Sequence, residues 1–306
     1  MDECASRANS SLGSSKGYPT SSTELLQSVG YLGNDPAKNP MFANWTKVFL
    51  PYGDGTSQLG DVTEPVIVTK GATPIYFRGA RVLRAMIDFL RAEGLSAATE
   101  VVVSGCSAGG LATYAHADTW SAALPKARVT ALADSGFFLD FNATGMPFNY
   151  TFPGRMLWTY MNTNVSGGGL LSPACTSTHT GSEWMCMFAE NLSLTLKTPL
   201  FALQSKYDSY QIGSILHMNA SAIPGINAYG ALLRSRLFNS LLSNPIHGAA
   251  LDSCYHHCGG AVWADIPFST SIVGQGAAFA AWYAGKGHVF EQQDVYPCTK
   301  CCGGVP

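Results

Sequence analysis

The stretch that decides the fold is Thr99-Glu100-Val101-Val102-Val103-Ser104-Gly105-Cys106-Ser107-Ala108-Gly109-Gly110-Leu111-Ala112-Thr113-Tyr114-Ala115. Its first part is rich in β-branched residues, which favours a strand, and its last part suits a helix. Between them lies a Gly-x-Ser-x-Gly turn, whose small residues let the backbone close up around Ser107. A serine on such a turn exposes its hydroxyl, and the helix behind it offers backbone N–H groups to a developing oxyanion. The stretch therefore predicts a nucleophilic serine.

The rest of the chain continues this alternation of strands and helices. Strands are predicted over 47–51, 99–105, 128–133, 199–204 and 249–253, and helices over 81–93, 109–122, 229–242 and 272–284. This order predicts an α/β protein, with a mostly parallel sheet covered by helices on both faces. Residues 1–45 read mostly as loop, and residues 140–195 read as irregular, forming a cap-like insertion. Because there is no internal repeat and no linker, we expect residues 1–306 to form a single α/β-hydrolase-like domain.

Composition and charge exclude two classes of partner. The chain of 306 residues is 46% hydrophobic and only 12% charged, with a net charge of −2 and no cluster of Lys and Arg. Binding to nucleic acid by neutralising phosphates is therefore not expected. No apolar run approaches the ~18 residues of a transmembrane helix, so we expect no membrane span.

Cysteines and glycosylation sequons favour an exported protein. Most of the nine cysteines lie in polar, Gly/Pro-rich stretches, as disulfide partners do in secreted chains. Asn-x-Ser/Thr sequons begin at Asn9, Asn44, Asn142, Asn149, Asn164, Asn191 and Asn219. The first residues, 1–5, lack the basic start and apolar core of a signal peptide. The protein is thus either cytosolic or continues upstream of Met1, and the cysteines and sequons favour secretion as a glycoprotein.

Two groups of cysteines carry more specific expectations. Cys175 and Cys186 flank a Thr/Ser/Gly-rich stretch and are predicted to form a disulfide that closes a loop of the cap. The clusters at 254–258 and 298–302 also resemble zinc ligands in their spacing. The sequons and the scatter of the cysteines favour disulfides over zinc there.

A nucleophilic serine needs a base, and the base needs a carboxylate that orients it. In parallel sheets the active site lies at the carboxyl ends of the strands. Asp208 and Asp134 each come just after a predicted strand, and Asp208 keeps the chain order Ser, acid, His of α/β-hydrolases. Position after a strand favours His256 or His257 as the base.

Several motifs together resemble a known family. They are Gly105-Cys106-Ser107-Ala108-Gly109-Gly110, Tyr207-Asp208-Ser209-Tyr210-Gln211-Ile212, Ser253-Cys254-Tyr255-His256-His257-Cys258, Asp54-Gly55-Thr56-Ser57, Phe77-Arg78-Gly79-Ala80-Arg81, Ala133-Asp134-Ser135-Gly136-Phe137-Phe138 and Tyr296-Pro297-Cys298. In this order they resemble the plant-type pectin acetylesterases, a family that includes the Notum carboxylesterases, which remove a fatty acyl group from Wnt proteins. The resemblance runs from about Cys4 to Cys302.

The resemblance implies a chemistry and a set of residues. Ser107 would be the nucleophile, Asp208 the orienting acid and His257 the base, since the third position after Cys254 selects His257 over His256. The backbone N–H of Ala108 would bind the oxyanion. The implied protein is a secreted, monomeric serine carboxylesterase that removes O-acetyl groups from a cell-wall or matrix polysaccharide, with no metal and no organic cofactor. A fatty-acyl esterase and an inactive or binding homologue are the alternatives.

The chain also departs from the family pattern. Family members carry a Gly-Gly-Gly-Trp-Cys stretch shortly before the segment that matches Cys4, and that stretch is expected to supply further oxyanion donors. We therefore expect the present sequence to lack the amino-terminal part, the usual partner of Cys4 included. Ala117 stands where plant members often have cysteine, which predicts an unpaired Cys106.

Overall fold

The computed structural model describes residues 2–10, 12–18, 30–67, 74–142, 145–259, 267–269, 271–298 and 300–302. In this part of the chain, five parallel strands form one sheet in the order β1-β2-β3-β4-β5. The strands are β1 (Glu100–Cys106), β2 (Arg128–Asp134), β3 (Leu200–Ser205), β4 (Gly248–Asp252) and β5 (Val289–Glu291). All carboxyl ends therefore lie at one edge of the sheet, as the sequence predicted.

Helices connect and cover the strands. They are α1 (Asp2–Ala8), α3 (Gly79–Ala92), α4 (Ala108–Ala123), α5 (Phe152–Asn162), α6 (Val165–Gly168), α7 (Pro173–Thr178), α8 (Ala189–Leu192), α9 (Ile223–Asn239) and α10 (Gln275–Tyr283). The predicted helices over 81–93 and 109–122 are confirmed as α3 and α4. Within the described residues, none of these helices has the length and hydropathy needed to cross a lipid bilayer.

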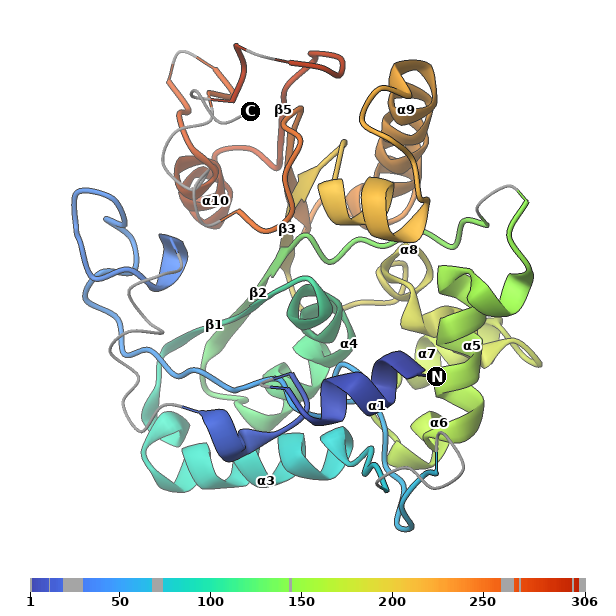
Figure 1. The fold of residues 1–306 in the computed structure, drawn as a ribbon. Coiled ribbons are helices and arrows are strands. Elements are labelled where there is room, and N and C mark those ends of the chain that lie inside the picture. The colour runs from blue at the N-terminus through green and yellow to red at the C-terminus, as the bar shows by residue number, and fades with distance from the viewer. Residues whose placement is uncertain are drawn as a thin grey trace.

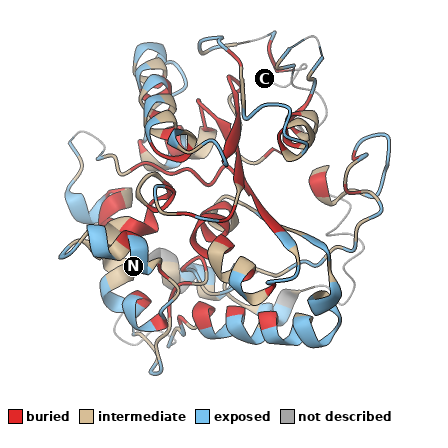
Figure 2. Cartoon of the chain, turned by 180° about the vertical axis from the view of Figure 1, so that it is seen from behind, coloured by how far each residue is buried: buried red, intermediate tan, exposed pale blue. Residues whose placement is uncertain are grey.

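Alternate residues of each strand enter different layers of the core. Ala131 and Ala133 of β2 pack with side chains of α4 and α9, whereas Leu132 packs on the other side with Phe279 of α10. This alternation is the two-residue period of a strand. Because both faces are covered, β2, β3 and β4 are buried almost throughout, and Figure 2 shows buried residues running along the sheet and the inner sides of the helices. The predicted two-sided covering of the sheet is confirmed.

The segment 140–195 is a helical cap rather than an irregular insertion. Figure 1 shows α5, α6, α7 and α8 together at one side of the molecule. The side chains of Thr151 and Ser172 accept hydrogen bonds from the first turns of α5 and α7, and each helix has proline in its first turn. Helices α6, α7 and α8 have only 4, 6 and 4 residues and show no 3.6-residue period, so the pattern missed them, while α5 was missed although it has 11 residues. The predicted disulfide between Cys175 and Cys186 is confirmed.

Four other expectations or omissions about the elements are corrected. Residues 47–51 do not form a strand. Among the described residues β1 pairs only with β2, so segment 47–51 has no neighbouring strand to which it is hydrogen-bonded. The three-residue strand β5 was not predicted, since so short a run carries no period. Helix α1 lies in a region that reads as loop, and α9 begins at Ile223 rather than at 229.

Candidate active site

Ser107 occupies a sharp turn between β1 and α4, which we call the nucleophile turn (residues 105–109). Its backbone has φ 59° and ψ −118°, a strained conformation of the kind that clusters at active sites. A Cβ on Gly105 would collide with the backbone of Gly109, and one on Gly110 with the carbonyl of Asp134. The Ser107 N–H donates to the Asp134 carbonyl at 2.9 Å. Close packing of backbone therefore requires the small residues that the motif supplies.

The Ser107 side chain makes no capping hydrogen bond to α4, although the residue precedes the first turn of that helix. Ala108 begins α4, so its N–H has no acceptor within the helix and points from a helix amino terminus. Ser57 Oγ donates to the Ala108 carbonyl at 2.9 Å, and His116 Nε2 bonds to the Ser57 carbonyl at 2.8 Å. These contacts hold the first turn of α4. Ser57 belongs to a motif that the sequence had already singled out, but its contact depends on tertiary structure.

Asp208 lies in the loop after β3, which we call the acid loop (residues 206–210), and it is completely buried. Its Oδ2 and Oδ1 atoms lie 2.8 and 3.0 Å from His257 Nδ1. The Oδ1 atom also accepts hydrogen bonds from the N–H groups of Tyr210 and Gln211, at 3.0 and 2.9 Å. The same carboxylate therefore begins the next helical turn and holds the imidazole ring.

His257 lies in the loop after β4, which we call the base loop (residues 253–259). Its ring stacks on Tyr210, with centroids 5.1 Å apart and an angle of 28° between the planes, and lies 6.3 Å from the Phe138 ring. The Nε2 atom is buried and has no hydrogen-bond partner among the described residues. The expected hydrogen bond from Ser107 Oγ to Nε2 is thus not formed, although such bonds commonly tighten only when substrate binds.

The other histidines weighed as bases have different partners. His256 Nε2 lies 3.0 Å from Asp252 Oδ1, and it forms a second buried pair beside the first. Burial alone would lower the pKa of His256, but the contact with Asp252 and the nearby charges of Asp134 and Asp208 together outweigh burial and raise it to about 9. His247 Nδ1 accepts from the Leu200 N–H at 3.2 Å at the opposite edge of the sheet, and burial lowers its pKa to about 4.

Asp134 contacts the base loop through backbone rather than through a histidine. Its Oδ2 accepts from the Gly259 N–H at 2.9 Å, and its Oδ1 from Ser135 Oγ at 3.0 Å. Ser135 Oγ in turn accepts from the Cys258 N–H at 2.9 Å. Burial raises the pKa of Asp134, while these hydrogen bonds act in the opposite direction. Asp134 therefore anchors the loop that carries His257 and is not its partner.

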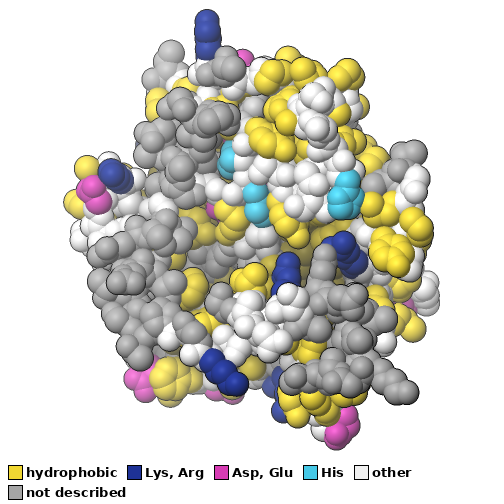
Figure 3. Space-filling view, in the orientation of Figure 1, with side chains coloured by type: hydrophobic (Ala, Val, Ile, Leu, Met, Phe, Trp, Pro, Cys, Tyr) yellow, Lys and Arg dark blue, Asp and Glu magenta, His cyan; other side chains and the backbone are white. Residues whose placement is uncertain are grey.

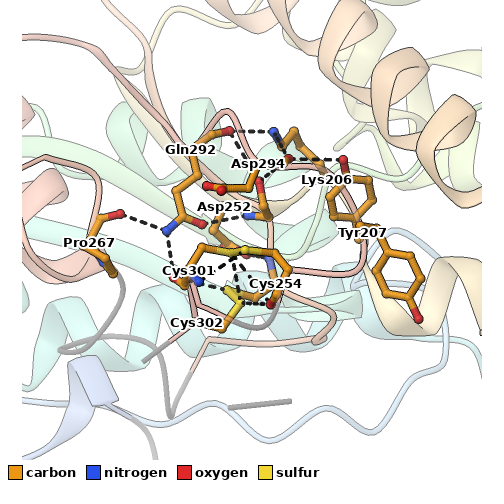
Figure 4. Close-up of a disulfide and its surroundings, with 12 residues drawn as sticks. Lys206, Tyr207, Asp252, Cys254, Pro267, Gln292, Asp294, Cys301 and Cys302 are labelled. Carbon is orange, nitrogen blue, oxygen red and sulfur yellow. Dashed lines mark hydrogen bonds between the residues drawn. A yellow bond between two sulfur atoms is a disulfide. The ribbon is translucent and has the colours of Figure 1, made fainter. Parts of the chain in front are cut away.

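Disulfides surround the base loop. Cys106, expected to be unpaired, is bonded to Cys258, because folding brings the ends of β1 and the base loop together across 152 residues. Cys254 is bonded to Cys302, and Cys298 to Cys301. Figure 4 shows the Gln292 side chain reaching Pro267 and Cys301 beside the Cys254–Cys302 bond, and both contacts measure 2.8 Å.

These disulfides contradict the interpretation of the two cysteine clusters as zinc ligands. Sulfur atoms that are joined to each other are not available as thiolate ligands. The described structure thus has the disulfides that the sequence favoured.

Comparisons with known proteins place the chain in a family. The family described as Pectinacetylesterase matches residues 1–303. Pectin acetylesterase 11 of Arabidopsis thaliana is 32% identical over 84% of this chain, and the chain spans 64% of that protein. Pectin acetylesterase 5 of the same plant is 29% identical over 98% of this chain and 72% of its own length.

A second group of relatives consists of Notum proteins. The palmitoleoyl-protein carboxylesterase NOTUM of Drosophila melanogaster is 31% identical over 69% of this chain and 32% of its own length. The crystal structure of the Wnt deacylase Notum from Drosophila superimposes with a TM-score of 0.83 at 25% identity, over all of this chain and 86% of that chain. The agreement in fold with Notum therefore extends over the whole chain, beyond the 69% that the Notum sequence matches.

Proposed function

This chain belongs to the pectinacetylesterase family, and on that basis we propose that it is a serine carboxylesterase that removes O-acetyl groups from a polysaccharide. The observation that carries the proposal is the buried pair of Asp208 and His257, placed at the same sheet edge as Ser107. An imidazole oriented through Nδ1 and unpartnered at Nε2 is poised to accept a proton. The match of His257 to the histidine motif of the family supports this role.

The proposed reaction uses these groups in sequence. His257 Nε2 takes the proton of Ser107 as Oγ attacks the ester carbonyl, and Asp208 stabilises the imidazolium that forms. The Ala108 N–H, at the amino terminus of α4, donates to the oxyanion of the tetrahedral intermediate. The protonated imidazole then gives its proton to the leaving alcohol. Water attacks the acyl-enzyme with His257 again as base, which releases acetate and restores Ser107.

The choice of an acetylated polysaccharide rests on relatives and on the surface. The relatives that match most of this chain are named pectin acetylesterases. Figure 3 shows Lys and Arg side chains beside histidines near the centre of one face, while most of the visible Asp and Glu side chains lie toward its edge. These few Lys and Arg side chains offer positive charges to an anionic chain such as a polyuronate.

The disulfides bear on the compartment of the protein, and the Notum relatives bear on a second candidate substrate. The four disulfides in the described residues suit an oxidising compartment, which supports secretion. The Notum relatives make a fatty-acyl ester the second candidate substrate, because the fold matches Notum over the whole chain.

The test is a series of p-nitrophenyl esters from acetyl to palmitoyl, with acetylated pectin as the polymer. We expect kcat/KM to be highest for acetate, with acetate released from pectin, and Ser107→Ala to abolish both activities. A maximum at palmitoyl would support the fatty-acyl candidate. Hydrolysis by Ser107→Ala at the wild-type rate would contradict the nucleophile, and no Ser107-dependent hydrolysis of any ester would favour a binding homologue.

A further inference from the structure

The Cys106–Cys258 disulfide joins the two residues that flank the proposed nucleophile and base. Cys106 immediately precedes Ser107, and Cys258 immediately follows His257. The two Cα atoms lie 5.7 Å apart, although 152 residues separate them in the chain. The cross-link therefore connects the end of β1 to the base loop, which leaves from β4.

The two segments that the disulfide joins leave from strands that are not neighbours in the sheet. Strands β2 and β3 lie between β1 and β4, so neighbouring-strand hydrogen bonds do not fix the distance from the nucleophile turn to the base loop. Among the described residues, no hydrogen bond or ion pair joins these two segments directly. The indirect route runs through the turn after β2, where Asp134 accepts from Ser107 N–H and Gly259 N–H, and Ser135 from Cys258 N–H.

The other side of the base loop is held independently. Ser209 N–H donates to the His256 carbonyl at 3.1 Å, Ser205 Oγ to the Cys254 carbonyl, and the Asp208–His257 contact lies on the same side. Cleavage of the Cys106–Cys258 bond would thus leave His257 attached to its carboxylate. What would be lost is the covalent constraint on the position of the imidazole relative to Ser107, which would then depend on the hydrogen bonds through Asp134 and Ser135.

Backbone strain is concentrated at the same contacts. Ser107, Ser135 and Cys258 have φ angles of 59°, 50° and 67°, in the left-handed region that residues other than glycine rarely adopt. Such conformations persist only where the surrounding structure over-determines them. A covalent bond between residues 106 and 258 supplies a constraint of that kind.

This disulfide is also more accessible than two of the others. Cys106 and Cys258 are half-buried, whereas Cys175, Cys186 and Cys254 are completely buried and Cys302 nearly so. Thiol–disulfide exchange needs access of a thiolate to a sulfur atom. A soluble dithiol therefore reaches the bond beside the site before it reaches the buried pairs.

We propose that the Cys106–Cys258 disulfide is a positioning cross-link between the nucleophile turn and the base loop, and that its reduction reversibly switches the esterase off. The proposal rests on the proposed function. A dithiol reductant supplies two electrons and two protons: the S–S bond breaks, two protein thiols form, and the reductant becomes its own disulfide. Reoxidation restores the bond and the position of the imidazole.

The first experiment compares the wild type with Cys106→Ala/Cys258→Ala, before and after treatment with dithiothreitol. Misplacement of reacting groups by about 1 Å costs about 10²-fold, so we expect kcat to fall by about 10- to 100-fold in the reduced wild type and in the untreated variant. KM should stay within about twofold, because the substrate contacts are unchanged. Oxidised glutathione should restore the wild type, and dithiothreitol should not affect the double variant further.

A matched control removes a disulfide that lies in the cap. Cys175→Ala/Cys186→Ala should lose thermal stability but keep its kcat below its melting temperature, which separates positioning from a general effect of disulfide loss. Alkylation followed by mass spectrometry should identify Cys106 and Cys258 among the labelled cysteines when activity is lost. Wild-type kcat in the Cys106→Ala/Cys258→Ala variant would overturn the proposal, and so would inactivation of that variant by dithiothreitol.

A second measurement does not depend on catalysis. Hydrogen exchange of the peptide that contains residues 253–259 should accelerate on reduction of the wild type, while peptides of β2 and β3 stay protected. If the oxidised protein has no Ser107-dependent activity, the proposed function fails. The hydrogen exchange of the base loop then tests the positioning role of the disulfide by itself. Unchanged exchange of the base loop after confirmed reduction of Cys106–Cys258 would reject the positioning role.

Discussion

The Asp208 carboxylate accepts hydrogen bonds from two directions. One set comes from backbone N–H groups that begin the next helical turn, and the other from the imidazole of His257. The backbone contacts fix the carboxylate, and the fixed carboxylate then sets which tautomer the ring adopts. Asp208 therefore has the geometry of a helix cap and of an orienting acid at the same time.

Asp208→Asn tests this assignment. The amide keeps the size of the side chain but favours the wrong tautomer of His257, and we expect kcat on p-nitrophenyl acetate to fall by about 10⁴-fold. Asp252→Asn is the matched control, because Asp252 holds the neighbouring His256 in a similar buried contact. An equal loss of kcat in both variants, measured on folded protein, would show that Asp208 has no special part in the reaction.

The strand, turn and helix over residues 100–123 form one closely packed unit. Its glycines are not equivalent: a Cβ on Gly105 would meet the backbone of Gly109, whereas a Cβ on Gly109 would meet open space. The turn thus needs glycine at the position where the strand backbone passes the helix. Position 109 accepts glycine but does not require it.

Gly105→Ala and Gly109→Ala should therefore have opposite effects on the free energy of unfolding. We expect Gly105→Ala to destabilise the protein by about 1–3 kcal/mol, the usual cost of overpacking. Gly109→Ala should stabilise it by up to about 1 kcal/mol, since alanine is the better residue inside a helix. Urea unfolding measures both, and a smaller loss for Gly105→Ala than for Gly109→Ala would contradict the packing argument.

Strands and helices were predictable where they were long enough for the spacing of their apolar residues to reflect burial. The strands over 128–133 and 199–204 alternate between two core layers or are buried throughout, and the helix over 81–93 has a regular apolar face. Strand β5 and the cap helices α6, α7 and α8 are too short to show a period. Residues 47–51 have the composition of a strand but no partner, and a strand needs hydrogen bonds from a neighbour.

Taken as a whole, the molecule places two buried His–Asp contacts side by side at the carboxyl edge of its sheet. The second of them, His256 with Asp252, links the end of β4 to the base loop. Asp252 also accepts from Gln275 of α10 at 3.1 Å. The stability of the whole fold should therefore respond to the protonation of His256.

The direction of this pH dependence follows from the raised pKa of His256. Its pKa in the folded protein is about 9, against an ordinary value of 6.5, because the carboxylates of Asp252, Asp134 and Asp208 together outweigh burial. The folded state holds the proton more tightly, so this contribution is complete below about pH 6.5 and is lost as the pH rises through about 9. We expect urea midpoints to decline over this window in the wild type and to be flatter in His256→Gln. An identical slope in His256→Gln would assign the pH dependence to other groups.

Local pattern alone identified the α/β class, the turn at Ser107 and the order of serine, acid and histidine. It could do so because strand and helix periods and small residues around a sharp turn are properties of short segments. Position after a strand limited the candidates for the base to His256 and His257, and the family motif selected His257. The contact of His257 with Asp208 now supports that choice, while its catalytic role stays a prediction.

Tertiary structure alone decided the partners that lie far apart in the chain. It paired Cys106 with Cys258, brought Asp134 into contact with the backbone of Gly259, and placed His256 against Asp252. Neighbours such as 256 and 257 look alike to any local rule, because both follow the same strand. Which ring meets which carboxylate depends on how the loops after β2, β3 and β4 cross the edge of the sheet, and that path is set only when the whole core has packed.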